Sequence, residues 1–434
     1  MLGKIKAEWN SLKKVVVHRP GIEMFFGLLE PYGSLYERAF SRSGARREHE
    51  FLEVILKKEF EVDVYRLKQT IIEAADKRPA VKKALVDLAR ETMDYSGDEK
   101  SVFRAKEEFE KNIKYLDTSH FFNILLINPA INFVVEKGSR NVQLNITKRQ
   151  PLANLYFMRD QQFMTDSGIV LCRLAKPARR NESRVLKFFW EHVMGLTLLH
   201  ETEDPGTIEG GEFIPFGKFA LVGIGDRTNR DAIDQLLKLE LSIEELGVVH
   251  QPMHPLVSAE EPDPMINMHL DTYFNVASEK VVVGCEALIK NAKVEIYKNE
   301  GNGKYTKKPE MVDLYSYMKS KGFEIINITT LEQLSYASNF LCIEDGKILA
   351  VEVERNIKKV LNRLKEITHA NPSRYGKLLD QALKDFEFLK EEGQFFPHKK
   401  EIYKFGIDPY SLSIPNLTGG YGAAHCMTCA LERG

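Results

Sequence analysis

The sequence lacks the long apolar segments that mark membrane proteins and secreted precursors. Its longest apolar runs, such as residues 124–127, are far shorter than the ~20 residues that cross a bilayer. The N-terminal residues Met1, Leu2, Gly3 and Lys4 do not open an extended apolar segment of the signal-peptide kind. We therefore expect a soluble protein of the cytoplasm with no membrane partner.

An excess of either charge is also missing. The chain has 61 basic and 62 acidic side chains, which give a formal net charge of -1. Proteins that bind nucleic acids or anionic lipid surfaces usually concentrate positive charge. The charge balance therefore predicts no nucleic-acid partner.

Cysteine is scarce. The five cysteines are an odd number and are widely spread, at positions 172, 285, 342, 426 and 429. A disulfide framework would need an even set, so this pattern is typical of a reducing compartment. Segments rich in Pro, Gly or Ser are absent as well, so the sequence predicts no flexible linker.

What the sequence does contain is an alternation of short apolar strands and amphipathic helices. With 434 residues, 43% of them hydrophobic, the chain can bury a large core. Strand-like segments precede helical ones about five times, which predicts an α/β fold. The expected strands are residues 12–21 with a Pro-Gly turn, 61–65, 168–172, 219–223, 281–284 and 348–351, and the expected helices are 49–58, 182–192 and 230–238.

Two blocks interrupt this alternation. In the first, apolar residues such as Val81 and Leu85 fall on one helical face, which predicts a helical insertion and no part of a sheet. The second block carries another helical stripe, including Leu378 and Leu389. The expected division is a main α/β unit of residues 1–67 and 151–434, a helical insertion at 68–150, and an additional helical excursion at 357–392.

Two charged segments stand where core strands or their ends are expected. A buried charge is costly unless it is paired or used, so each is a candidate site. Arg159 and Asp160 follow an aromatic residue and form either a structural ion pair or part of a site. Glu209 precedes Gly210 and Gly211, which suit either a solvated turn or a close backbone approach to a ligand.

A third segment pairs a histidine with a carboxylate. Strand alternation would place His269 and Asp271 on the same side of one strand. Such a pair suits general acid/base work. A satisfied core histidine and a metal ligand are the alternatives, although no third ligand stands at a helpful spacing.

The fourth segment is a Gly-rich loop, residues 419–425, that leads directly to Cys426. Cys426 and Cys429 have the spacing of redox or zinc sites, but a second cysteine pair to complete a zinc site is missing. A loose C-terminal tail is the other alternative, although the residues after Cys426 are too apolar for one. Cys426 is therefore a candidate nucleophile.

Together, and in this order, the four segments resemble the arginine deiminase family of guanidine-modifying enzymes. The family pattern is Arg-Asp after an aromatic residue, Glu-Gly-Gly-acid, His-Leu-Asp-Thr, and a Gly-rich loop with His-Cys-Met, and the chain carries all four. The resemblance covers nearly the whole chain. It implies a five-module α/β propeller (pentein) with a helical insertion, an active site in the central channel, and a hydrolase without metal or cofactor.

The resemblance also implies a role for each catalytic residue. Cys426 would attack the carbon of a guanidinium that Asp160 and Asp271 grip through its N–H groups. His269 would protonate the departing amine and later activate water, while Glu209 keeps His269 oriented and protonated. The implied reaction converts a guanidinium amino acid, L-arginine first of all, to a ureido product such as citrulline and ammonia.

Three residues are implied at the amino-acid end of the substrate. Asn154 matches the family's contact to that end, and Arg179 and Arg227 match the arginines that bind the α-carboxylate. For Arg179 the alternative is a plain basic surface pair with Arg180.

Two positions at the rim of the site depart from the family pattern. Tyr421 stands where the family often has an arginine, five residues before the nucleophile. Arg38 stands where an acid would face the α-amino group of the substrate. These departures leave the identity of the guanidino compound open.

Three other functions stay open at this point. An amidinotransferase would use the same covalent intermediate but deliver the amidino group to an amine. A deiminase could act on another guanidino compound, and a non-catalytic arginine sensor could keep only the binding residues. The expected partners are a small guanidino substrate and further copies of the chain in a homo-oligomer.

Overall fold

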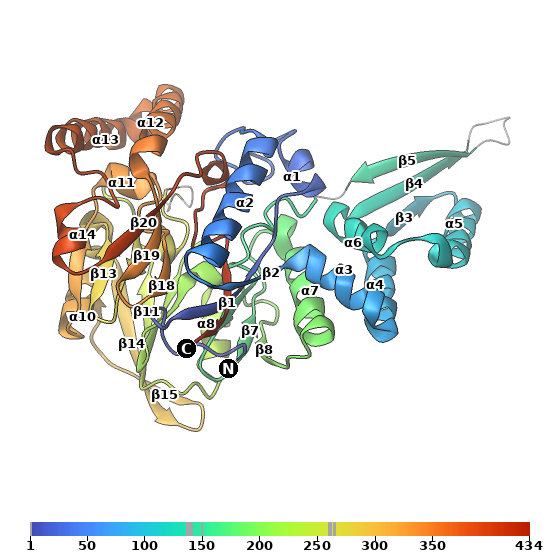
Figure 1. The fold of residues 1–434 in the computed structure, drawn as a ribbon, viewed down its shortest axis with the longest axis horizontal. Coiled ribbons are helices and arrows are strands. Elements are labelled where there is room, and N and C mark those ends of the chain that lie inside the picture. Colours follow the sequence, from blue (N-terminus) through green and yellow to red (C-terminus); the bar gives the residue numbers. More distant parts are fainter. Residues whose placement is uncertain (1, 136–141, 149–150, 259–262, 264–265) are drawn as a thin grey trace.

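The computed structural model describes residues 2–135, 142–148, 151–258, 263 and 266–434. Strands fill the middle of the main body, helices lie around them, and an arm extends to one side (Figure 1). The N- and C-terminal ends lie close together (Figure 1).

Five sheets of the main body share one pairing pattern. In each, a central strand pairs antiparallel with one neighbour and parallel with the other. The central strands are β1 (Leu12–Val17), β7 (Ile169–Leu171), β10 (Phe219–Ile224), β13 (Val281–Gly284) and β19 (Lys347–Val351). Their antiparallel neighbours are β21 (Cys429–Arg433), β6 (Gln162–Met164), β9 (Phe213–Pro215), β12 (Phe274–Val276) and β18 (Leu341–Glu344). Their parallel neighbours are β2 (Asp63–Arg66), β8 (Leu198–Glu201), β11 (Glu245–His250), β17 (Glu324–Asn327) and β20 (Asp408–Leu412).

The parallel pairs explain the alternation seen in the sequence. Two parallel strands need a long crossover, which is usually helical. The crossovers contain α2 (Arg42–Lys58), α7 (Arg180–Phe188), α8 (Arg230–Leu236), α10 (Leu314–Ser320) and, in the fifth sheet, α12 (Val353–Ala370), α13 (Pro372–Glu392) and α14 (Lys400–Lys404). The predicted excursion at 357–392 is therefore the enlarged crossover between β19 and β20.

The break between α12 and α13 follows from local sequence. Pro372 disfavours a helical conformation at Asn371, and its fixed φ suits the first position of the next helix. The Asn371 side chain accepts a hydrogen bond from the Arg374 backbone N–H at 3.2 Å and caps α13. The helix ends at Gly393, whose φ of 61° is left-handed and therefore favours glycine.

The C-terminal segment is an integral part of the fold. β21 pairs with β1, so the last residues lie beside the first strand (Figure 1). Leu431 in β21 is fully buried, as are Val15 and Val16 in β1. The alternative of a loose tail after Cys426 is therefore wrong.

The described part of the insertion contains four α-helices and also a small sheet. Its helices are α3 (Leu67–Lys77), α4 (Pro79–Thr92), α5 (Glu99–Asn112) and α6 (Thr118–Ile127), and their buried Ile71, Leu85 and Phe121 belong to the same apolar cluster as Val16. The rest forms a small sheet of β3 (Asp94–Gly97), β4 (Pro129–Val135) and β5 (Val142–Lys148) in the projecting arm (Figure 1). The prediction of a purely helical block is wrong there, because alternating residues such as Leu144 and Ile146 follow strand periodicity. The predicted boundary at residue 150 lies outside the described residues.

The other expected elements are confirmed, although some of their ends shift. The expected helix at 49–58 is α2 and begins seven residues earlier, at Arg42. The expected strand at 61–65 is β2, and the expected helix at 182–192 begins earlier, as α7, and continues as a π-turn, Phe189–Val193. Additional elements are α1 (Ile22–Gly27), α9 (Glu286–Ile289), α11 (Thr330–Leu334), and the strands β14 (Lys293–Gly301), β15 (Lys304–Lys307) and β16 (Val312–Asp313), which extend the sheet of β11.

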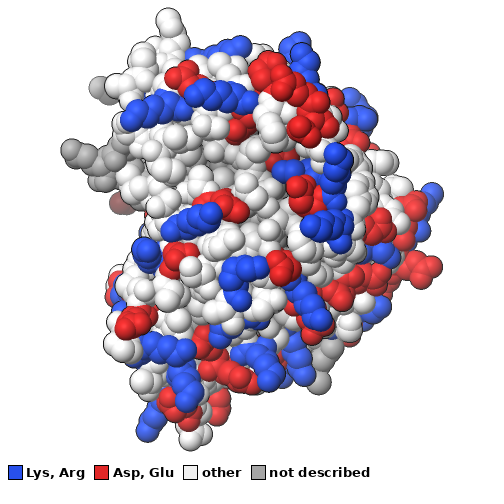
Figure 2. Space-filling view, turned by 90° about the vertical axis from the view of Figure 1, so that its left-hand side faces the viewer, with Lys and Arg blue, Asp and Glu red and all other residues white. Residues whose placement is uncertain are grey.

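The surface agrees with the balanced charge of the sequence. Lys, Arg, Asp and Glu side chains are interspersed over the face drawn in Figure 2. Among the described helices, none has the length and apolar character required to cross a membrane.

Candidate active site

All five sheets contribute to one buried cluster. In each sheet the contributing residues lie shortly before the antiparallel neighbour of the central strand. They are Cys426 before β21, Asp160 before β6, Glu209 before β9, His269 and Asp271 before β12, and Asn339 before β18. Backbone hydrogen bonds join these segments, for example from Arg159 N to Cys426 O at 3.0 Å and from Gly210 N to Asp160 O at 3.0 Å. The fold thus brings together the five catalytic residues expected from the sequence.

His269 and Asp271 do not lie on a strand, so this part of the sequence prediction is wrong. Leu270–Thr272 is a single 3-10 turn, closed by a hydrogen bond from Thr272 N to His269 O at 3.0 Å. The turn is stabilised by contacts that are distant in sequence: the Leu270 backbone N–H donates to Glu212 at 2.8 Å. A Cβ atom on Gly211 would lie 2.7 Å from Nδ1 of His269, so the glycine makes room for the imidazole.

The Cys426 thiol lies between an amide and a carboxylate. Nδ2 of Asn339 donates to Sγ of Cys426 at 3.1 Å, and Sγ lies 3.6 Å from Oδ2 of Asp271. Burial raises the pKa of the Cys426 thiol well above its usual value, and the charges of Asp271 and Asp160 raise it further, against the Asn339 hydrogen bond. These surroundings favour the neutral thiol, and an added positive charge beside it would favour the thiolate.

His269 is held by a buried carboxylate. Its Nε2 lies 2.8 Å from Oε2 of Glu209. Burial alone lowers the pKa of His269, but the Glu209 hydrogen bond and the nearby charge of Asp160 outweigh it and raise the pKa to about 9. The imidazole is therefore a cation at neutral pH and can serve as a proton donor.

Several buried polar atoms around Cys426 have no hydrogen-bond partner among the described residues, and three of them belong to the expected catalytic residues. They are Oδ1 of Asp160, Oδ1 of Asp271 and Nδ1 of His269. Nδ1 lies 3.8 Å from Oδ1 of Asp160, beyond hydrogen-bonding distance. Buried polar groups are normally satisfied, so two carboxylate oxygens here suit a ligand with several N–H donors.

The residues expected at the substrate's amino-acid end line the same cavity. Asn154, Arg179, Arg227 and Tyr421 all contribute to it, beside Cys426 and His269. Its volume of ≈ 20 Å³ has room for about one water, so the side chains are packed closely.

Both arginines are ion-paired within the chain. Nη1 of Arg179 donates to Asp160 at 2.8 Å, and its Nη2 donates to Glu182 at 2.8 Å. Arg227 is buried, and its Nη1 lies 3.8 Å from Glu209. Arg179 is also buried, so the alternative of a basic surface pair with Arg180 is wrong.

Arg38 does not take the position expected for it. Its Nη2 donates to the Pro415 carbonyl at 3.1 Å and to Thr418 at 3.0 Å. Arg38 lines neither the cavity beside Cys426 nor a second, larger cavity that Tyr421 also lines. The preceding residue, Glu37, lines the larger cavity instead. The sequence prediction placed Arg38 at the rim of the site, whereas Glu37 takes the position beside a cavity. Tertiary contacts of this loop decide which of the two side chains points inward, and the sequence alone does not show them.

One trio has the residue types and spacing of a metal site. Ligand atoms of Asp160, Glu209 and His269 lie within 4.8 Å of one another. Arg179 and Arg227 already approach these carboxylates, so a divalent cation would meet two fixed positive charges. The geometry fits ion-paired catalytic carboxylates better than a metal centre.

Comparison with known proteins agrees with this geometry. The family model described as arginine deiminase matches residues 33–433. The chain belongs to the arginine deiminase family. Members of this family are hydrolases that act on the guanidino C–N bond of arginine.

Relatives within the family span nearly the full length. The arginine deiminase of Halobacterium salinarum is 26% identical, and the alignment covers 98% of this chain and 96% of that protein. The arginine deiminase of Staphylococcus aureus is 24% identical over 80% of this chain and 88% of that protein.

Solved structures support the mixed α/β fold of the family. AgrE in complex with ornithine and NAD+ superimposes with a TM-score of 0.51 at 13% identity. The superposition covers 97% of this chain, which spans 39% of the length of AgrE. A variant of AgrE with bound L-arginine also gives a TM-score of 0.51 at 13% identity, covering 97% of this chain and 40% of that one.

Sequence reasoning missed three residues of this family member's site. Asn339 contacts the Cys426 thiol, and His425 lies with Nδ1 2.7 Å from Asp271. Glu212 is buried, and burial raises its pKa to about 7. Glu212 and His425 stand within recognised motifs and could have been inferred, whereas Asn339 is surrounded only by Ser338 and apolar residues and carries no signal of its own.

Proposed function

We propose that the protein hydrolyses L-arginine to L-citrulline and ammonia through a covalent adduct on Cys426. The observation that supports this most is the set of unpartnered buried atoms beside the thiol, Oδ1 of Asp160 and Oδ1 of Asp271. A guanidinium is planar and rich in N–H donors, so it can bind both carboxylates at once. Its positive charge also favours the thiolate of Cys426.

The residues suit each step of the reaction. The Cys426 thiolate forms a bond to the guanidinium carbon, and a C–N bond breaks as His269 gives a proton to the departing ammonia. The neutral imidazole then takes a proton from water, whose oxygen bonds to the same carbon. The C–S bond breaks and the thiolate leaves, while the added hydroxyl gives its proton to solvent. Neutral citrulline is released, and Cys426 is again a thiolate beside the imidazolium of His269. Glu209 stabilises the cationic imidazole before and after the cycle.

Arg179 and Arg227 are our candidates for the α-carboxylate of the bound amino acid, and Asn154 is our candidate for a contact to the same end of it. Nε of Arg227 lies 3.1 Å from Asp226 and its Nη1 lies 3.8 Å from Glu209. Arg227 lines the cavity beside Cys426, which supports a role in binding the substrate. Tyr421 takes the place of the family's arginine and lines the cavity with an aromatic ring.

The proposed architecture is a five-module propeller. The five sheets with a common pairing pattern are its modules, and the shared position of their catalytic residues supports a central active site. Residues 1–67 and 151–434 are the proposed catalytic unit, 68–150 the inserted unit, and 357–392 an excursion within the catalytic unit. A cytoplasmic location and a homo-oligomer stay predictions from the sequence.

Product analysis tests this function against its alternatives. With L-arginine alone we expect citrulline and ammonia in equal amounts. Ornithine plus a new guanidino compound, formed only when an amine is added, would indicate an amidinotransferase. Binding without turnover would indicate a sensor. The Cys426→Ser variant is expected to lose turnover, and acid quenching of wild-type protein during turnover should trap an adduct detectable by mass spectrometry.

A further inference from the structure

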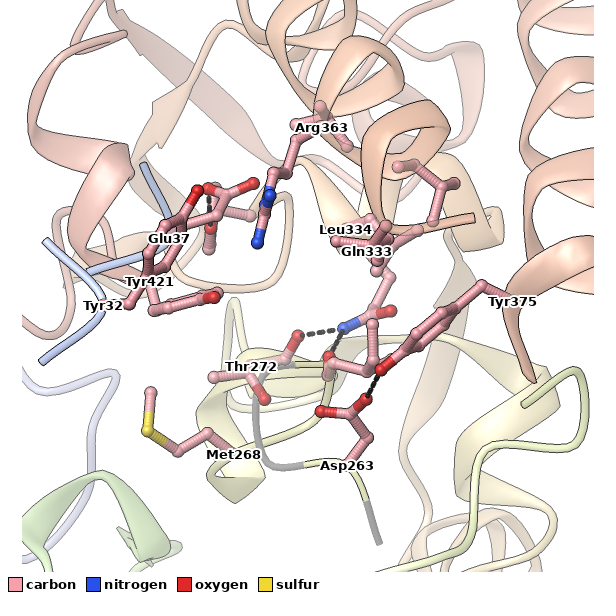
Figure 3. Close-up of a pocket in the computed structure, with 15 residues that line it drawn as sticks. Tyr32, Glu37, Asp263, Met268, Thr272, Gln333, Leu334, Arg363, Tyr375 and Tyr421 are labelled. Carbon is pink, nitrogen blue, oxygen red and sulfur yellow. Dashed lines mark hydrogen bonds between the residues drawn. The ribbon is translucent and has the colours of Figure 1, made fainter. Parts of the chain in front are cut away.

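A larger cavity lies beside the catalytic cavity, where α12 and α13 cover the main body (Figure 3). Its volume is ≈ 190 Å³, against ≈ 20 Å³ for the catalytic cavity. Met268 and Tyr421 line both, so these two side chains form the boundary between them. We refer to the larger space as the outer cavity.

A guanidinium group reaches into the outer cavity from α12. Figure 3 shows Arg363 extending toward Glu37 and Tyr421, and no ion pair joins Arg363 to Glu37 in the described part of the chain. Nη1 of Arg363 contacts exposed Glu366 at 3.3 Å, and its guanidinium lies 5.0 Å from the centre of the Tyr32 ring. An exposed ion pair contributes little. Arg363 therefore keeps its capacity to bind a carboxylate.

Two acceptor atoms in the same cavity have no donor among the described residues. Gln333 is buried, and its Nε2 donates to the carbonyls of Ile266 and Thr272, while its Oε1 has no partner (Figure 3). On Glu37, Arg38 and Tyr336 both contact Oε2. Oε1 of Gln333 and Oε1 of Glu37 are thus available to an N–H-rich group such as an ammonium.

Aromatic rings complete the walls. Tyr32, Tyr375 and Tyr421 all line the outer cavity (Figure 3). Ring faces attract organic cations. Arg363 already lies over the Tyr32 ring and Arg374 over the Tyr375 ring, so the Tyr421 ring is the wall that suits the guanidinium tail of a ligand. A carboxylate binder, two acceptors for an ammonium and an aromatic wall for a second cation together match a cationic α-amino acid.

We propose that the outer cavity is a capture site for a cationic α-amino acid of the arginine class, which then passes between Met268 and Tyr421 to Cys426. This inference rests on the proposed function, because it assigns the substrate of that reaction to a second site. Tyr421 belongs to the loop of Cys426 and has a φ of 71°, which a bulky residue rarely adopts. The loop conformation therefore holds the Tyr421 side chain at the boundary between the two cavities.

The test compares L-arginine with agmatine, which is arginine without its carboxylate. In the Arg363→Met variant we expect kcat/KM for L-arginine to fall about 10- to 100-fold, because a charge-assisted contact with the carboxylate is lost. The kcat for L-arginine is expected to stay unchanged, since the chemistry at Cys426 is untouched. Values of kcat/KM for agmatine are expected to stay within about 2-fold of wild type.

The matched control is Lys365→Met, which removes an exposed positive charge from the same helix outside the cavity. Its kcat/KM is expected to equal that of wild type. Equal losses for L-arginine and agmatine in Arg363→Met, or no loss for either, would overturn the capture site while leaving the proposed function intact.

Calorimetry separates failure of the capture site from failure of the proposed function. L-Arginine is titrated into the Cys426→Ala protein with and without Arg363→Met. If wild-type protein turns over neither compound but binding weakens about 10-fold or more on Arg363→Met, the proposed function fails and the capture site stands. If neither turnover nor Arg363-dependent binding is seen, both proposals fail.

Discussion

Nε2 of His269 lies 2.8 Å from Oε2 of Glu209, and both side chains are buried. The second ring nitrogen, Nδ1, has no hydrogen-bond partner among the described residues, and His269 lines the catalytic cavity. The geometry therefore separates two roles on one imidazole: Nε2 is held by a carboxylate, and Nδ1 is available to the substrate. Since Glu209 raises the pKa of His269, its removal should change the pH dependence of the reaction.

The first prediction concerns the alkaline limit of activity. Turnover needs a protonated His269, so kcat/KM is expected to fall as pH rises through about 9, the pKa of His269. Glu209→Gln keeps the size of the side chain and removes its charge, so the limit should move to lower pH and kcat should fall. The control is Glu203→Gln, which changes an exposed residue in the same connection and should alter neither the alkaline limit nor kcat. An unshifted alkaline limit in Glu209→Gln would contradict the assigned role.

The same pair predicts a pH-dependent stability. The folded pKa of His269, about 9, is above its ordinary value of 6.5. Its contribution to stability is therefore fully present below pH 6.5 and is lost as pH rises through about 9. Urea unfolding at a series of pH values should give a free energy that declines across this window in wild type and less steeply in Glu209→Gln. Parallel declines in the two proteins would contradict the prediction.

A third prediction concerns Asn339, whose Nδ2 contacts the Cys426 thiol at 3.1 Å. Asn339→Asp keeps Oδ1, which accepts from Ala423 N at 2.8 Å and Cys426 N at 3.2 Å, but replaces the donor with a negative charge. The thiolate should become harder to form, and kcat should fall about 10- to 100-fold. The alkaline rise in iodoacetamide reactivity should move to higher pH. Unchanged thiol reactivity would show that Asn339 does not stabilise the thiolate.

Local pattern was sufficient to predict most strands and helices, because each has the apolar periodicity of its type. It failed at Pro129–Val135 and Val142–Lys148, where alternating residues such as the exposed Leu144 form a sheet outside the core. It also failed at His269 and Asp271. Their motif identified the right residues, but the turn that carries them depends on Glu212 and Gly211, far away in sequence.

The rim of the site was harder to predict than its centre. The proposed catalytic residues stand in short motifs, each placed before an equivalent strand. Glu37 lies in the loop before α2, Gln333 lies on α11 and Arg363 lies on α12, and tertiary packing brings these three segments to one cavity. The local sequence pattern does not indicate which of the two neighbours, Glu37 or Arg38, points into the cavity.

A fourth prediction tests the two carboxylates as a cation site. 2-Chloroacetamidine is a cation and 2-chloroacetamide is its neutral counterpart, and both alkylate thiols. The cation should bind between Asp160 and Asp271 and favour the thiolate, so inactivation should be about 10- to 100-fold faster than with the amide. In Asp160→Asn the ratio of the two inactivation rates, amidine over amide, should fall, because one negative charge of the site is lost. Equal rates for the two reagents in wild type would remove the basis for a guanidinium site.

The last prediction concerns Arg179, which joins the carboxylates of Asp160 and Glu182 at 2.8 Å each. Breaking a buried ion pair leaves an uncompensated charge, so Arg179→Gln should destabilise the fold by about 3–5 kcal/mol. Burial raises the pKa of Asp160, and Arg179 opposes this, so the variant should also lose activity at mildly acidic pH as Asp160 takes up a proton.

The matched control is Arg180→Gln. Arg180 is its exposed neighbour, with one weak hydrogen bond to the Leu174 carbonyl at 3.4 Å, so its removal should cost less than about 1 kcal/mol in urea unfolding. Equal losses in the two variants would mean that Arg179 contributes no more to stability than an ordinary surface arginine.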